Sequence, residues 1–175
     1  MKQTELKQRL NDMEKKELSA LICKLYKNSK QVQSMIDVIF CGDAAEEQLI
    51  TECKKKIHAS FFGKRLSLRN ARTVISDFKK IVQNKERVAE LMLFYVECGV
   101  DFTNLYGDID DAFYSSIEYV FHEFVHLVNN MADNGYYQQN AERIDRLIRD
   151  TDQIGWGFAD AMAQAYGQIQ WREEI

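Results

Sequence analysis

The chain has 175 residues, of which 46% are hydrophobic and 29% are charged, a composition typical of one globular domain and too apolar for a disordered chain. It contains no proline and only eight glycines, which favours helices joined by short loops and argues against two domains on a flexible linker. The net charge of −4 does not by itself exclude any class of partner.

The first half of the chain predicts a series of helices, because apolar residues recur at helical spacing and polar residues stand where helix caps belong. The second of these helices should carry its apolar side chains on one face, at Leu18, Leu21, Ile22, Leu25 and Tyr26. We expect a short first helix over 4–10 and a cap for the second at Asn11 or Asp12. Ser29 should cap the next helix, which stops near Gly42, and a capping box of Asp43 with Glu46 should begin the one after it. A corner at 61–63 and a further helix capped by Ser67 follow.

The second half predicts further helices separated by one irregular stretch. We expect a helix over about 85–97, irregular chain over 100–108, a long helix from Asp108 or Asp110 to about Met131, and helices over about 140–150 and 156–171. Trp156 lies between two glycines, which favours close packing at a helix corner. No segment shows the sustained alternation of a strand. The sequence therefore predicts an all-α protein, a single domain over residues 1–175 with eight or nine helices packed as a bundle or as stacked helical pairs.

Signals of compartment and cofactor are few. The start of the chain lacks the apolar core of a secretory signal, and the longest apolar run, 91–96, is far shorter than the roughly 18 residues that a membrane helix needs. The four cysteines include no Cys-x-x-Cys pair and are expected to be small buried residues in a reducing compartment; they are Cys23, Cys41, Cys53 and Cys98. We therefore expect a cytoplasmic protein with no membrane segment and no cofactor.

Several stretches resemble an uncharacterised bacterial family of small helical proteins, the domain of unknown function numbered 6155. They are 90–108, the pattern Phe113-Tyr114-x-Ser116, 154–160, and the amino-terminal pattern of Glu5-Leu6 with Lys16-Glu17-Leu18 and Leu25-Tyr26. The resemblance covers nearly the whole chain, and its most specific parts are Tyr-Val-Glu-Cys-Gly-Val and Gly-Trp-Gly-Phe. It implies a bacterial origin and a helical fold, and it implies no activity.

One motif suggests zinc chemistry. In His122-Glu123-x-x-His126, two imidazoles four residues apart on a helix can bind one zinc while the carboxylate acts as base. The glycine and third histidine of the metzincin extension are absent, since Asn129 and Ala132 stand there. A helical wheel also places both histidines opposite Phe124, on the polar face. We therefore expect a solvated surface, and no catalytic, cofactor-binding or metal-binding residue is assigned. A zinc site of His122 and His126 with Glu123 as base stays the alternative.

Charge is unevenly distributed along the chain. Residues 52–87 have a net charge of +8 and residues 88–175 a net charge of −12. The basic residues within 54–87 could neutralise phosphates, but the segment carries no nucleic-acid motif and could instead be solvated or pair with the acidic half. Our leading expectation is a non-enzymatic helical protein that acts through protein–protein contacts or self-association. The alternatives are a zinc-dependent hydrolase and a nucleic-acid-binding module.

Overall fold

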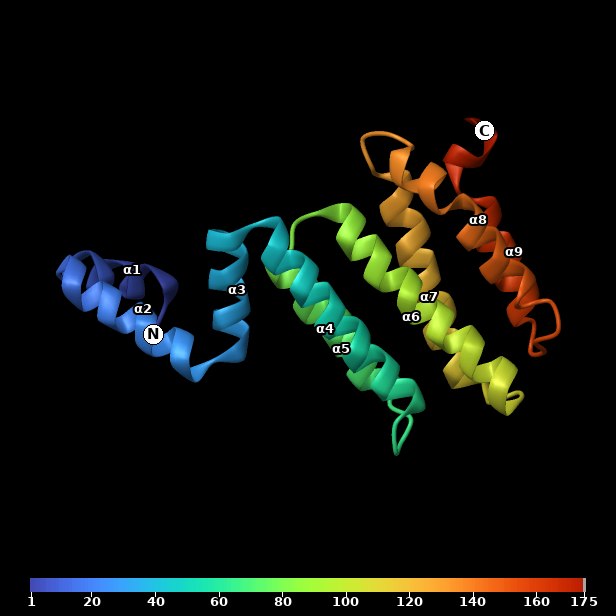
Figure 1. The fold of residues 1–175 in the computed structure, drawn as a ribbon, viewed down its shortest axis with the longest axis horizontal. Helices are drawn as coiled ribbons and strands as arrows, with labels where there is room; N and C mark the ends of the chain where they lie inside the picture. The colour runs from blue at the N-terminus through green and yellow to red at the C-terminus, as the bar shows by residue number, and fades with distance from the viewer. Residues whose placement is uncertain (175) are drawn as a thin grey trace. The chain divides into compact units, whose positions relative to one another are not determined.

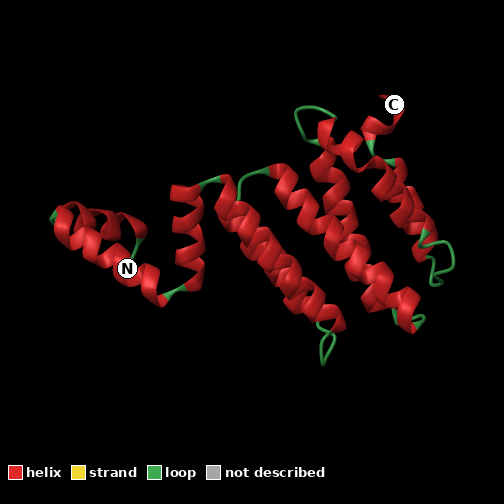
Figure 2. Cartoon of the chain, viewed as in Figure 1, coloured by secondary structure: helices red, strands yellow, loops and turns green. Residues whose placement is uncertain are grey.

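The computed structural model of the chain describes residues 1–174. Within this range the chain forms nine α-helices and one terminal 3-10 helix, and no strand (Figure 1, Figure 2). The bounds are α1 Gln3–Asn11, α2 Lys15–Asn28, α3 Lys30–Cys41, α4 Asp43–Phe62, α5 Leu68–Ile81, α6 Lys85–Tyr106, α7 Asp111–Asn129, α8 Gly135–Arg149, α9 Phe158–Gly167 and η1 Gln170–Glu174. The predicted all-α fold class is confirmed.

The chain divides into two compact units, Met1–Glu47 and Gln48–Ile175, and each is described by itself. In the first unit α2 packs against α3. The Tyr26 hydroxyl donates to Asp37 Oδ1 over 2.9 Å, and Gln33 Nε2 donates to the Tyr26 hydroxyl oxygen over 3.4 Å. That the two units form one domain stays a prediction.

Several helices begin at the caps that the sequence predicts. Ser29, Ser67 and Asp110 each accept a hydrogen bond from a backbone N–H of the first turn, which satisfies one of the donors that a helix start leaves free. The cap of α2 is different from the prediction. Glu14, and not Asn11 or Asp12, precedes this helix and forms a capping box with Glu17, so the first helix extends further than expected.

The helix α6 is longer than the sequence suggests. We expected it to end at Cys98-Gly99 and the chain to be irregular over 100–108, but α6 continues to Tyr106. Gly99 usually weakens a helix interior, yet here it lies against α7. A Cβ atom on Gly99 would lie 2.5 Å from Ile117 Cδ1. The glycine therefore allows close approach of α6 and α7 and does not end the helix.

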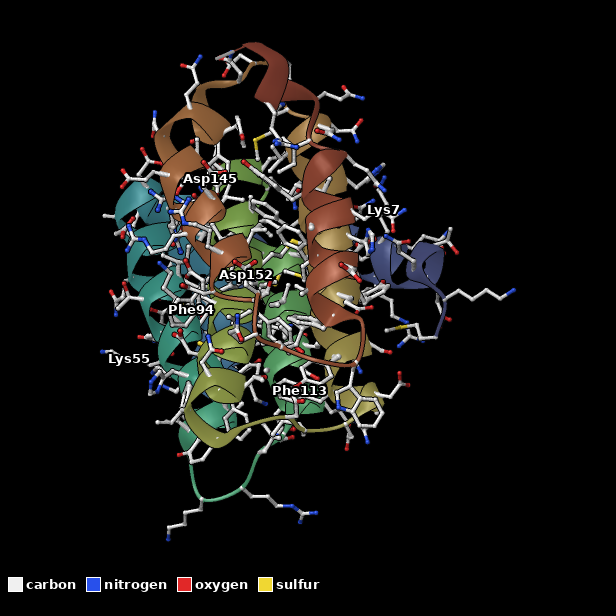
Figure 3. All side chains as sticks on the ribbon, turned by 90° about the vertical axis from the view of Figure 1, so that its right-hand side faces the viewer. Lys7, Lys55, Phe94, Phe113, Asp145 and Asp152 are labelled. Atoms are coloured by element: carbon white, nitrogen blue, oxygen red, sulfur yellow. The ribbon has the colours of Figure 1, made fainter. Side chains whose placement is uncertain are left out.

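The core of the second unit surrounds α6, which carries more buried residues than any other described helix. α6 packs against α5, α7 and α8, and α9 packs against α7 and α8. Aromatic rings join the layers: Phe113 of α7, labelled in Figure 3, lies at ring-centroid distances of 6.3 Å from Phe61 of α4 and 5.7 Å from Phe102 of α6. This packing fixes the surfaces that α5, α6 and α7 present together.

The C-terminal third departs from the prediction in two places. α8 begins at Gly135, about five residues before the start at about 140 that the sequence suggests. α9 begins at Phe158, and Trp156 lies before it with φ 60° and 63% of its surface exposed. The expected close packing of Trp156 is therefore wrong, because the turn directs its ring outward.

The cysteines divide into two pairs. Cys53 and Cys98 are buried as predicted, whereas Cys23 and Cys41 of the first unit are exposed and correct that prediction. Among the described residues, none of the helices combines the length and the apolar character that a bilayer crossing requires.

Candidate functional site

The His122-Glu123-x-x-His126 motif lies in the fourth and fifth turns of α7. Both imidazoles are exposed, which confirms their predicted place on the polar face. His126 lies against Asn130, whose amide nitrogen is 3.4 Å from its Nε2. Within residues 1–174 no three His, Cys, Asp or Glu side chains come together in a way that could hold a metal ion. Two imidazoles alone leave most of the coordination sphere to water, which gives weak and poorly selective binding.

Glu123 has a different neighbourhood from the two histidines. Its Oε2 lies 3.7 Å from Lys79 Nζ of α5, and both side chains are partly exposed. Glu123 also lines a cleft between α5, α6 and α7 that neither histidine lines. A metalloprotease base must reach water bound to the metal that its histidines hold. Here the carboxylate is engaged with a lysine on a neighbouring helix.

The basic stretch 54–87 is divided between α4, the loop that holds Lys64 and Arg65, α5 and the start of α6. Part of it pairs with the acidic half of the chain, as one of our sequence interpretations expected: Lys54 with Glu90, at 2.5 Å, and Lys79 with Glu123. Other cations of the stretch project outward, as Lys55 does from α4 (Figure 3). The segment is thus a set of helix faces with different environments. It does not form one uniform basic surface.

A cluster of charged side chains that sequence reasoning did not find connects α4, α6 and α8. Arg143 donates from Nε and Nη2 to the two carboxylate oxygens of Glu97, over 2.6 and 2.8 Å, and from Nη1 to Glu90 over 2.6 Å. Lys54 donates to the other oxygen of Glu90. Burial alone would raise the pKa of Glu90, but these hydrogen bonds outweigh it and hold the pKa below its ordinary value. The partners are far apart in sequence, so no local signal could have revealed them.

The first unit presents an unusual amount of apolar surface. None of the residues of α1, α2 and α3 is buried. Large apolar side chains of these helices are instead exposed, including Ile22 and Leu25 of the predicted stripe: Leu6 40%, Ile22 50%, Leu25 48%, Met35 39%, Ile39 72% and Phe40 83%. Amphipathic helices of a soluble protein normally cover such stripes. This surface is the largest mismatch between the pattern of the sequence and the burial in the structure.

Comparison with known proteins gives one match. The model of the Family of unknown function (DUF6155) matches residues 1–168. No curated protein and no solved structure matches the chain.

Proposed function

Since the chain belongs to the Family of unknown function (DUF6155), an assignment that specifies no activity, we propose a function from the surfaces of the chain itself. The protein is a non-enzymatic helical protein that self-associates through the apolar faces of α2 and α3. The observation that carries this proposal is the exposed apolar surface of residues 1–47. The zinc-hydrolase and nucleic-acid alternatives stay predictions.

The small size of the first unit favours a binding partner that covers its apolar face. A unit of 47 residues is close to the length below which chains usually need disulfides, metals or oligomerisation to fold. Ordering each residue costs about 1–2 kcal/mol of conformational entropy, and burial of apolar surface is the main term that offsets it. Because none of the residues of α1, α2 and α3 is fully buried, contacts within the unit supply only part of this offset, which supports contact with another surface.

A second copy of the chain is the occupant that we propose. Ile22 and Leu25 of α2 are three residues apart, and Met35 and Ile39 of α3 are four residues apart, the spacing by which helices pack into bundles. In a two-fold dimer the same patch meets itself, so each copy covers the other. Residues 1–47 carry eight basic and eight acidic side chains. Two copies therefore meet without net repulsion.

The test is the mass of the full chain in solution, measured by sedimentation velocity between about 1 and 100 μM. We expect a concentration-dependent dimer. Ile39→Glu places a charge in the proposed interface and should give a monomer with unchanged helical circular dichroism. Leu105→Glu is the matched control, because Leu105 is 65% exposed, close to the 72% of Ile39, and lies outside the first unit. A wild-type monomer at 100 μM overturns the proposal, and so does equal dissociation by the two substitutions.

A further inference from the structure

A cleft of about 360 Å³ opens between α5, α6 and α7. This volume lies in the range of small-molecule sites, which are usually concave, mostly apolar and supplied with a few convergent polar groups. The lining residues come from three helices of the same unit: Arg72, Ile75, Ser76 and Lys79 of α5, Met92 of α6, and Tyr119, Val120 and Glu123 of α7. None of these lining residues belongs to residues 1–47.

The apolar part of the cleft is built from core residues. Ile75, Met92 and Val120 are 6%, 1% and 4% exposed, so they are held in place by the packing beneath them. Tyr119 is 58% exposed and adds an aromatic side chain to the lining. Such a rigid surface favours a flat apolar group, since its burial needs little rearrangement of the protein.

The polar part of the cleft is dominated by positive charge. Arg72, Ser76 and Lys79 are four and three residues apart on α5, a spacing that places them on one helix face. Among the described residues, Arg72 forms no ion pair and no hydrogen bond. Lys79 has a carboxylate partner in Glu123, but the 3.7 Å separation and the exposure of 39% and 45% make this pair weak and easily rearranged.

We propose that this cleft binds a small organic anion with a flat apolar body. The apolar body packs on Ile75, Met92 and Val120, and the carboxylate or phosphate of the ligand accepts hydrogen bonds from Arg72, whose planar guanidinium suits such groups. Lys79 adds a second positive charge. Glu123 pairs with Lys79 and therefore competes with the ligand for this charge, which gives Glu123 a role without a metal.

The first experiment compares charged and neutral probes of the same shape. Titration of the full chain with 2-naphthoate, followed by NMR line shifts, should give one saturable site with a Kd of about 1 mM or tighter, in keeping with the affinity of small ligands. The neutral alcohol 2-naphthalenemethanol should bind at least about fivefold more weakly. Equal binding of the two probes, or no saturation by 10 mM naphthoate, overturns the proposal.

The second experiment locates the site with substitutions on the exposed side of α5. Arg72→Gln should weaken naphthoate about tenfold, the effect expected for loss of a hydrogen bond to a charged group, and should leave the neutral alcohol unchanged. Lys80→Gln is the matched control, since it removes the same charge from α5 at a residue that pairs with Asp77. An equal effect of the two substitutions would show only a general charge effect and would contradict the site.

A second pair of variants tests two further lining residues, Glu123 and Ser76. Glu123→Gln frees Lys79 and should strengthen naphthoate binding about two- to fivefold, whereas a base in a zinc site would give no such gain. Ser76→Phe fills the cleft from an exposed position and should abolish binding of both probes. Helical circular dichroism checks that each variant folds. Unchanged binding in Ser76→Phe places the probe elsewhere and overturns the proposal.

Discussion

Replacement of Arg143 by Met removes the cation that joins α8 to α6. The substitution leaves the carboxylates of Glu90 and Glu97 close together without their shared partner, and methionine retains much of the apolar stem of arginine. The three side chains are 31%, 22% and 23% exposed. Breaking a fully buried ion pair from one side costs about 3–5 kcal/mol. Partial access of water reduces this to about 2 kcal/mol of unfolding free energy.

Urea denaturation followed by circular dichroism measures this loss. With a slope of about 2 kcal/mol per molar urea, the midpoint should fall by about 1 M in Arg143→Met. Arg146→Met is the matched control: Arg146 lies one turn further along α8, is exposed and forms no ion pair within the described residues. Its midpoint should shift by less than about 0.25 M. A shift of that small size in Arg143→Met would refute the inference that the cluster stabilises the helix packing.

The acid side of the stability profile gives an independent check of the same cluster. The folded-state pKa of Glu90 lies below its ordinary value, so its contribution is present above the unfolded pKa and is lost as pH falls through the folded one. As the pH falls below the ordinary glutamate pKa of 4.5, the wild-type chain should therefore lose more stability than Arg143→Met, in which this pKa rises. Parallel acid profiles of the two chains would contradict the assignment.

Three further outcomes follow from single residues. The exposed thiols of Cys23 and Cys41 should react rapidly with a disulfide reagent in the native chain, and those of Cys53 and Cys98 only after unfolding. Burial excludes the reagent from the second pair, and it raises the pKa of Cys98 to about 12. Asp101→Asn should stabilise the chain by up to about 0.5 kcal/mol at pH 7, because desolvation and neighbouring carboxylates raise the pKa of Asp101. The charged form of Asp101 is the one that costs stability, so the gain should vanish at low pH, where this carboxyl is protonated in the folded and unfolded chain. His122→Ala and His126→Ala should each change stability by less than about 0.5 kcal/mol, and elemental analysis of untagged protein should find no tightly held zinc; one zinc per chain lost in either variant would contradict this.

Local patterns in the sequence predicted the features that depend on neighbours along the chain. The caps at Ser29 and Ser67 follow from side chains that bond their own first turn. The buried and polar faces of α7 follow from the 3.6-residue period, which placed Phe124 in the core and His126 at the surface. Helix identity and helix faces were therefore accessible without the structure.

Features that depend on distant residues were not accessible. Glu97 and Arg143 are 46 residues apart, and no local sequence pattern near either residue indicates the other as its partner. The cleft beside Glu123 requires three helices in their packed positions. The apolar period of α2 correctly located the stripe with Ile22 and Leu25, but it could not say what covers the stripe. Periodicity identifies a face, and only tertiary or quaternary packing decides whether that face is buried.

The missing side chain at Gly99 has a mechanical consequence for the pair α6 and α7. Ile117 lies where a Cβ of Gly99 would be, 2.5 Å from its Cδ1, so the isoleucine occupies a notch on α6. Residues three and four positions from Gly99 share its face of α6, so if α7 slid along α6, Ile117 would meet the larger side chains of Tyr95 and Val96 or of Phe102 and Thr103. Close packing at Gly99 therefore opposes sliding of the two helices past each other and fixes their register.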